Sequence, residues 1–133
     1  MFILTCTDCR TSIGVSTGGI ANCTLATPLQ APLWAVVASL THARRILEVG
    51  CGQGYTAANM ASAAGPDCRV DTIEENPQHA ALAEEAFQLR DLSNRINVLR
   101  GRGQDILPRL TDCYDVVFLD GDWREYPFKI ERV

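Results

Sequence analysis

Apolar and polar residues alternate along the chain in two kinds of segment. Short apolar runs that end in glycine or an acidic residue are typical of buried strands, and longer Ala- and Leu-rich stretches are typical of helices. The predicted strands lie at 45–50, 69–74, 96–101 and 114–121. The predicted helices lie at 28–41, 55–64, 77–90 and 104–110, with a further helix beginning at 126. Strands that alternate with helices predict an α/β fold with a parallel sheet and helices on both of its faces.

The start of the chain has a different pattern. Residues 1–25 are rich in Thr, Ser, Gly and Cys without a clear period, so we expect an irregular segment with at most one short strand. A single domain is expected to follow at 26–133. Residues 11–43 carry no Asp, Glu, Lys or Arg, but their dense apolar core covers only 31–40. A membrane-spanning helix needs about 20 apolar residues, so a buried helix is the better interpretation.

The amino-acid composition indicates which binding partners and which cellular compartment to expect. The chain has 133 residues and a net charge of −4, so a nucleic-acid backbone is not an expected partner. Its six cysteines are scattered and no signal peptide precedes them, which favours free thiols in a reducing cytoplasm. Cys6 and Cys9 form a C-x-x-C pair, but no second pair accompanies it, so we do not expect a zinc or redox site there.

A glycine-rich turn follows the first predicted strand. Gly50, Gly52 and Gly54 lie in the sequence EVGCGQGY, with Glu48 two residues ahead of Gly50. Glu74 ends the second strand, where a carboxylate can accept hydrogen bonds from both hydroxyls of a ribose. The dinucleotide pattern G-x-G-x-x-G would need glycine at Tyr55, which disfavours NAD. The turn and Glu74 together therefore favour another ligand that contains a nucleoside.

Four segments in this order resemble the motifs of one family. They are ILEVGCGQGYTA, DTIEENP, GRGQDILPRL and YDVVFLDGDWREY. The chain is similar over about 27–126 to class I S-adenosylmethionine-dependent methyltransferases, and most similar to the catechol-type small-molecule O-methyltransferases. The resemblance implies a Rossmann-like parallel sheet of strand order 3-2-1-4, counting the predicted strands along the chain, and S-adenosylmethionine as the cofactor.

The resemblance also implies roles for named residues. Glu74 corresponds to the family's ribose-binding carboxylate, and Gly103 with Gln104 to the residues that meet adenine. Asp120 corresponds to the carboxylate that ends the fourth strand. The resemblance implies that this carboxylate is catalytic and pairs with the methionine ammonium. It also implies that Asp120 is the ligand of a divalent ion, Mg²⁺. The implied cofactor-binding set is Glu48, Gly50, Gly52, Gly54, Thr56, Glu74, Gly103, Gln104 and Asp120. In it the glycine amides and the following helix N-terminus would receive the methionine carboxylate, and Thr56 would add a hydroxyl.

Two departures from the family leave alternatives open. Trp123 stands where the resemblance places a catalytic lysine, and the family's sheet has seven strands where we expect four. The favoured function is methyl transfer from S-adenosylmethionine to a small-molecule hydroxyl, in a domain that resembles the family only as far as its fourth strand. The alternatives are a non-catalytic or truncated S-adenosylmethionine-binding module and, less favoured, half of an NAD-binding oxidoreductase. An unpaired edge at the fourth strand would favour self-association or cover by the N-terminal segment.

Overall fold

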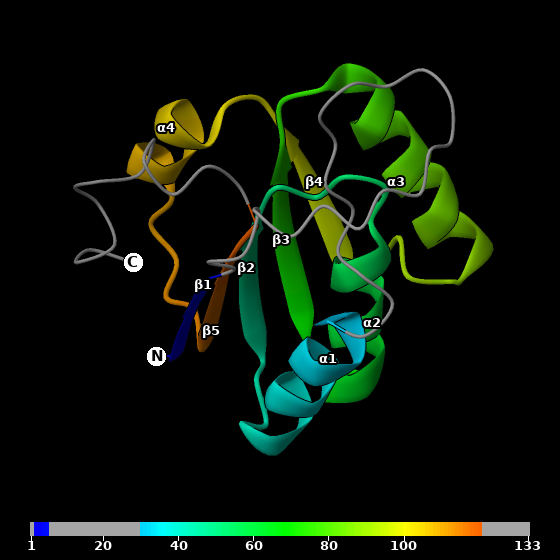
Figure 1. Cartoon of the computed structure of the whole chain (residues 1–133), viewed down its shortest axis with the longest axis vertical. Helices are drawn as coiled ribbons and strands as arrows, with labels where there is room; N and C mark the ends of the chain where they lie inside the picture. Colours follow the sequence, from blue (N-terminus) through cyan, green and yellow to red (C-terminus); the bar gives the residue numbers. More distant parts are fainter. Residues whose placement is uncertain (1, 6–29, 121–133) are drawn as a thin grey trace.

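Five parallel strands form one sheet in the computed structural model, which describes residues 2–5 and 30–120 (Figure 1). The strands are β1 (Phe2–Thr5), β2 (Arg45–Val49), β3 (Arg69–Glu74), β4 (Ile96–Arg100) and β5 (Val116–Leu119). Their order in the sheet is β1-β5-β2-β3-β4, and each neighbouring pair is parallel. Apart from β1, this is the predicted order 3-2-1-4, so the predicted fold class is confirmed.

The helices follow the sequence signals for helix ends. They are α1 (Gln30–Leu40), α2 (Tyr55–Ala64), α3 (Pro77–Leu89) and α4 (Gly103–Ile106), which continues into the 3₁₀ helix η1 (Leu107–Arg109). Helix α2 has the predicted bounds and stops at Gly65, whose φ of 97° is uncommon for residues with a side chain. Helix α3 begins at Pro77 because the side chain of Asn76 accepts hydrogen bonds from two N–H groups of the first turn.

Helices cover both faces of the sheet, as predicted. On one face, α1, α2 and α3 bury an apolar core against alternate strand residues, including Ile46, Val70 and Phe118. On the other face, the α4 and η1 segment packs against Leu47, Ile73 and their neighbours. Figure 1 shows α4 on the opposite side of the sheet from α1, α2 and α3. Among the described residues, none of the helices has the length and apolarity that crossing a bilayer requires.

The N-terminal segment contains one short strand, as the prediction for residues 1–25 allowed. This strand, β1, pairs with β5 and so joins the same sheet as the predicted domain at 26–133. The pairing covers the edge of β5 that would otherwise stay open, which was one of the two expected solutions. A four-residue strand with a partner more than 100 positions away leaves no periodic signal of its own. Residues 6–25, with Cys6 and Cys9, lie outside the described residues.

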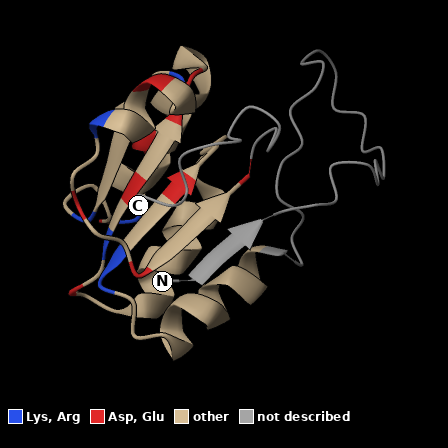
Figure 2. Ribbon diagram, turned by 90° about the vertical axis from the view of Figure 1, so that its left-hand side faces the viewer, with Lys and Arg blue, Asp and Glu red and all other residues tan. Residues whose placement is uncertain are grey.

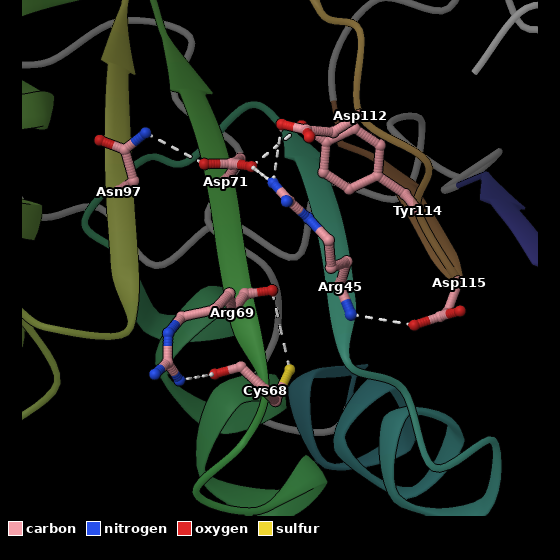
Figure 3. Close-up of polar contacts among 8 residues, drawn as sticks. All are labelled: Arg45, Cys68, Arg69, Asp71, Asn97, Asp112, Tyr114 and Asp115. Atoms are coloured by element: carbon pink, nitrogen blue, oxygen red, sulfur yellow. Dashed lines mark hydrogen bonds and ion pairs between the residues drawn. The ribbon is translucent and has the colours of Figure 1, made fainter.

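A polar cluster ties four strand regions together on the α4 side of the sheet. The carboxylate of Asp71 on β3 accepts hydrogen bonds from Arg45 Nη2 at 3.1 Å, Tyr114 Oη at 2.9 Å and Asn97 Nδ2 at 3.0 Å (Figure 3). Arg45 Nη2 also lies 2.9 Å from Asp112 Oδ2. These residues lie in or just before β2, β3, β4 and β5, so the cluster fixes the strands at the end away from the glycine turn.

Candidate cofactor site at the carboxyl ends of the strands

Three neighbouring strands bring carboxylates to the same end of the sheet. Glu48 on β2 is in register with Thr72 on β3 and with Phe118 on β5. Glu74 and Asp120 lie two residues further along those two neighbouring strands, so all three carboxylates belong to one face. Acidic segments lie near the ends of neighbouring strand arrows in Figure 2. The resemblance selected these three residues separately, and the structure brings them together.

Glu48 is the most deeply buried of the three. It has no exposed surface, and its Oε2 accepts a hydrogen bond of 2.5 Å from Thr72 Oγ1. Its Oε1 has no hydrogen-bond partner among the described residues. Burial, with smaller contributions from the nearby carboxylates of Asp120 and Glu74, raises the pKa of the Glu48 carboxyl to about 8. Ionised Glu48 would therefore be a buried negative charge without a cation beside it.

Asp120 ends β5 and is the last residue that the structure describes. Its N–H donates to the carbonyl of Val49 at 2.8 Å, so the strand ladder still holds the backbone at this position. Burial raises the pKa of the Asp120 carboxyl to about 6. Trp123 and the helix expected to begin at 126 lie outside the described residues.

Glu74 is buried like Glu48, but its carboxylate is well satisfied. Only 7% of the residue is exposed; Oε2 accepts from the N–H of Gly52 at 2.7 Å and Oε1 from that of Asn76 at 2.8 Å. His79 Nδ1 lies 3.9 Å from Oε1. The carboxylate thus links the end of β3 to the glycine turn, and each oxygen retains a lone pair for a further donor such as a ribose hydroxyl.

The glycine turn has the conformation that its sequence predicts but uses its amides differently. Gly50, Gly52 and Gly54 have φ values of 96°, 53° and 79°, which glycine adopts without steric cost. The N–H groups of Gly50 and Cys51 donate to the carbonyl of Ile73, and that of Gly54 to Cys51. With the Gly52 N–H bonded to Glu74, most amides expected to receive a methionine carboxylate are already engaged.

Gly54 serves packing as well as the turn. A Cβ atom at this position would lie 2.6 Å from the ring of Phe87 on α3 and 3.1 Å from Ala83. The glycine therefore lets α3 approach the start of α2 closely. Thr56 lies in the first turn of α2 and is buried, as expected for a hydroxyl facing a site at the helix N-terminus.

Gly103 and Gln104 follow the adjacent strand, β4, at the same end of the sheet. Gly103 is buried at the start of α4, whereas Gln104 is exposed. The N–H of Gly101 donates to the carbonyl of Glu74 at 2.9 Å, which holds the beginning of this segment next to the end of β3. Gly103 and Gln104 follow this segment, the Gln104 side chain is exposed, and their contact with adenine stays a prediction.

Sequence reasoning missed three groups that shape this site. Thr72 bonds Glu48, Asn76 holds Glu74, and His79 lies beside Glu74. Thr72 was detectable, because alternation along the strand places it on the same face as Glu74. Asn76 reads as a helix cap from sequence, but its N–H contact with Glu74 depends on how the chain turns. His79 shows no signal that separates it from an ordinary residue of a helix.

The arrangement is suited to a cation beside a nucleoside. Three carboxylates converge, and neither Glu48 nor Asp120 has a described cationic side chain as a partner. A buried cluster of this kind attracts positive charge. Cys51 is not a candidate nucleophile, because burial raises the pKa of its thiol.

Comparisons with known proteins identify the family. A sequence model of the O-methyltransferase family matches residues 21–133. Catechol O-methyltransferase of Sus scrofa is 41% identical over 85 residues, which cover 60% of this chain and 45% of that protein. Catechol O-methyltransferase of Mycobacterium tuberculosis is 36% identical over 94 residues, covering 70% and 43%.

Solved structures agree with this result. The O-methyltransferase TomG of Streptomyces achromogenes, solved in complex with SAM, superimposes with a TM-score of 0.74 at 33% identity, over 77% of this chain and 48% of that one. The O-methyltransferase of Bacillus cereus, solved in complex with SAH, gives 0.73 at 27% identity, covering 77% and 49%. The chain spans about half the length of the curated relatives it matches. With its family model matched over 113 positions (133 − 21 + 1), the chain belongs to the O-methyltransferase family.

Proposed function

We propose that the chain binds S-adenosylmethionine at the carboxyl ends of β2, β3 and β5 and serves methyl transfer to a hydroxyl of a small molecule. The observation that carries the proposal is the convergence of Glu48, Glu74 and Asp120 beside the glycine turn. The ligands named for TomG and for the Bacillus cereus enzyme support the same cofactor.

The residues present fit the parts of that cofactor. Glu74 would accept the ribose hydroxyls, and the segment at Gly103 and Gln104 would lie against adenine. Since the turn's amides are largely engaged, the N-terminus of α2 and the Thr56 hydroxyl would receive the methionine carboxylate. Glu48 and Asp120 would face the cationic groups. The unpartnered Oε1 of Glu48 is the structural observation that favours a cation at this position.

The chemistry requires positioning and a proton acceptor. When bound, S-adenosylmethionine supplies a methyl group that an oxygen nucleophile attacks. The protein's part is to orient the acceptor hydroxyl and to exclude water. Asp120 is the proposed catalytic residue, because a carboxyl with a pKa of about 6 is mostly ionised at neutral pH and can still accept a proton.

Magnesium does not follow from the described residues. Mg²⁺ prefers several oxygen ligands, and Asp120 is one donor of this kind. The described residues contain no group of three or more His, Cys, Asp or Glu side chains that could hold a metal ion. Among the described residues Asp120 is thus a single candidate ligand without a preformed cluster, and no step is assigned to the metal.

The substrate proposed is a catechol-like hydroxyl compound, on the strength of the names of the relatives. A non-catalytic S-adenosylmethionine-binding module is not favoured, because the family model and the relatives are O-methyltransferases. Neither a nucleic acid nor a membrane is proposed as a partner. A cytoplasmic location of the protein stays a prediction, which rests on its scattered cysteines.

Binding measurements test the cofactor proposal directly. We expect isothermal titration of the full chain to show S-adenosylmethionine binding and no NAD binding. Glu74→Ala should weaken binding about 10–100-fold, which corresponds to the loss of about 1.5–3 kcal/mol from hydrogen bonds to a charged group. Glu85→Gln, an exposed change on α3, is the matched control and should leave the affinity unchanged. NAD binding in place of S-adenosylmethionine would favour the oxidoreductase alternative.

A methyl-transfer assay on a catechol panel then separates the enzyme from the non-catalytic module. Turnover that falls in Asp120→Asn would support the proposed catalytic role. Cofactor binding without any turnover would favour the binding module.

A further inference from the structure

One edge of the sheet is covered by β1, and the other edge, formed by β4, is open among the described residues. The carbonyl of Arg95 and the N–H of Gly101, which flank β4, both bond to β3 at 2.9 Å. In a parallel ladder, alternate residues direct their peptide groups to the same neighbour, so those of Ile96, Val98 and Arg100 point away from β3. The N–H and C=O of Val98 therefore have no partner in the described part of the chain, and an extended peptide could pair with them.

A hollow of about 510 Å³ lies beside this open edge, between β4 and α3. Helix α3 runs along β4 on the face of the sheet that carries the larger core (Figure 1). The floor of the hollow is apolar, because Phe87 and Ile96 are buried there and Val98 packs against the same core. Every second side chain of an added strand would point to this face of the sheet and enter the hollow.

The rim of the hollow is acidic. Among the described residues that line it, Glu84 and Glu85 carry charge and neither Lys nor Arg is present. Glu84 is already paired, since Arg100 donates to its two carboxylate oxygens from Nε at 3.2 Å and from Nη2 at 2.6 Å. Glu85 is exposed and has no described hydrogen-bond or ion-pair partner. A basic side chain of a ligand would therefore meet an unpaired carboxylate in this hollow.

We propose that the open edge of β4 and this hollow form a docking site for an extended segment of another protein, one that carries an apolar and a basic side chain two positions apart. The segment adds to the sheet as a further strand, with its apolar side chain over Phe87 and its basic side chain at Glu85. Pairing uses the carbonyl of Ile96 and both peptide groups of Val98, whereas the N–H of Ile96 is excluded because it donates to the carbonyl of Leu92 at 3.0 Å. The inference goes beyond the proposed function, since the hollow borders 96–98, the first part of β4, and the cofactor site lies at the carboxyl ends of the strands.

A second copy of this chain is a poorer occupant than such a segment. Pairing β4 with its own copy would bring Glu84 and Glu85 of both chains to one interface, which places two carboxylates from each copy against one Arg100 guanidinium group from each. The excess of negative charge opposes that contact, whereas it attracts a basic strand.

The experiment measures the binding of a synthetic peptide to the full chain by fluorescence anisotropy. The probe is acetyl-Thr-Val-Thr-Lys-Thr-Val-Thr-Lys-Thr with fluorescein at its C-terminus, which presents valine and lysine on one face when it is extended. We expect saturable binding of this peptide, and binding at least about fivefold weaker for the same peptide with glutamate in place of lysine. Glu85→Lys should reverse this preference. Asp105→Lys, an exposed change of the same charge on the opposite face of the sheet, should leave it as in wild type.

Alternate N-methylation tests whether the peptide adds as a strand. Methyl groups on the backbone nitrogens of the valines and lysines, or on those of the threonines, remove the N–H donors along one side of the extended peptide. One of these two sets faces β4, so we expect one methylated peptide to bind at least about tenfold more weakly and the other to bind as the parent does. Val98→Pro, which removes an outward N–H of β4 and spares the bonds to β3, should weaken the binding of the parent peptide.

The outcomes decide the proposal independently of the cofactor. Absence of saturable binding, equal affinity for the lysine and glutamate peptides, or equal effects of the two methylation patterns would overturn it. Wild-type dimers in sedimentation velocity that Val98→Pro disperses would assign the edge to a second copy and overturn it as well. Titration of Glu85→Lys with S-adenosylmethionine is expected to match wild type, and a lack of cofactor binding in both proteins would contradict the proposed function alone.

Discussion

Two buried glutamates on neighbouring strands have opposite surroundings. Glu74 accepts two backbone hydrogen bonds, so its negative charge is stabilised and its position is fixed. Glu48 has one hydroxyl donor and two acidic neighbours, so its charge is penalised. Both residues are glutamates near the carboxyl end of a buried strand. The fold supplies two N–H donors to Glu74 and one hydroxyl donor to Glu48. Glu74 is therefore a structural anchor, whereas the charge of Glu48 lacks donors and could be stabilised by a ligand.

The penalty on Glu48 predicts a pH effect on the ligand-free protein. Its pKa is about 8 in the fold against an ordinary value of 4.5. The folded state therefore binds the proton more tightly than the unfolded state. This contribution to stability is complete below about pH 4.5 and is lost as the pH rises through 8.

Glu48→Gln removes that loss while keeping an acceptor for Thr72. We expect its melting temperature, relative to wild type, to be higher by at least about 4 °C at pH 8.5 than at pH 5, since a change of 1 kcal/mol shifts a small domain by about this amount. Calorimetry of both proteins at the two pH values gives the comparison. A difference that does not change with pH would contradict the assigned burial of the charge.

Sequence spacing could locate the anchors of the site but not their hydrogen bonds. Glu74 and Asp120 were predictable because each ends a strand, and parallel strands meet at their carboxyl ends. The occupation of the turn's amides was not predictable, because it depends on the carbonyl of Ile73 and the carboxylate of Glu74 reaching the turn. The contact between His79 and Glu74 likewise arises from how α3 leaves β3.

Among the elements, the close approach of α3 to the glycine turn depends on one small residue. Gly54 combines a φ of 79° with the ring of Phe87 where a Cβ would lie. Any side chain at this position would destabilise the fold in two ways. It would strain the backbone at a positive φ, and its Cβ would clash with Phe87 of the neighbouring helix. Gly65 has a φ of 97° with a ψ of 177° and nothing within 4 Å of its Cβ position, so a substitution there meets only the cost of its own backbone conformation.

This comparison gives a double-mutant cycle. Gly65→Ala should cost about 1–3 kcal/mol from its backbone conformation alone. Gly54→Ala should add to its backbone cost the overlap of its methyl group with the ring of Phe87 at 2.6 Å. Phe87→Leu removes the two ring atoms concerned, so it should reduce the cost of Gly54→Ala by at least about 1 kcal/mol.

Urea unfolding of the single and double variants measures the change in the free energy of unfolding that each substitution causes. Additive costs for Gly54→Ala and Phe87→Leu would show that the two residues do not compete for the same space.

Element types and most element bounds followed from the sequence pattern. Helix α2 matches its prediction at both ends, and α3 ends one residue earlier than expected, at Leu89. The predicted helix at 104–110 is instead a short α-helix followed by a 3₁₀ turn, since Pro108 has no N–H to continue the α-helical ladder. The predicted helix at 28–41 is described only from Gln30, and it ends at Leu40.

At the scale of the whole molecule, contacts between residues far apart in the sequence hold the strands in place, and local sequence patterns do not predict these contacts. The Asp71 cluster joins residues from four strand regions, and none of its members was singled out in the sequence. Strand β1 is a second case, because its partner β5 lies at the other end of the chain. Both features hold the sheet along its width, which keeps the strand ends that form the candidate site in fixed relative positions.

The role of β1 as an edge cover predicts an asymmetry between adjacent proline substitutions. Along an edge strand, successive N–H groups point alternately toward the neighbouring strand and toward solvent. Ile3 pairs in register with Val117 and Leu4 with Phe118, so proline at one of these two positions removes a ladder hydrogen bond with β5, and proline at the other does not.

We therefore expect one of Ile3→Pro and Leu4→Pro to release β1 and expose the edge of β5, which then pairs with a second chain. Sedimentation velocity should show dimers or larger species for that variant and the wild-type distribution for the other. Ile3→Ala and Leu4→Ala, which keep their N–H groups, control for the lost side chains. If both proline variants sediment as wild type, β1 is not what keeps the edge of β5 from pairing with another chain. The self-association expected of an open edge would then have to be prevented by another part of the protein.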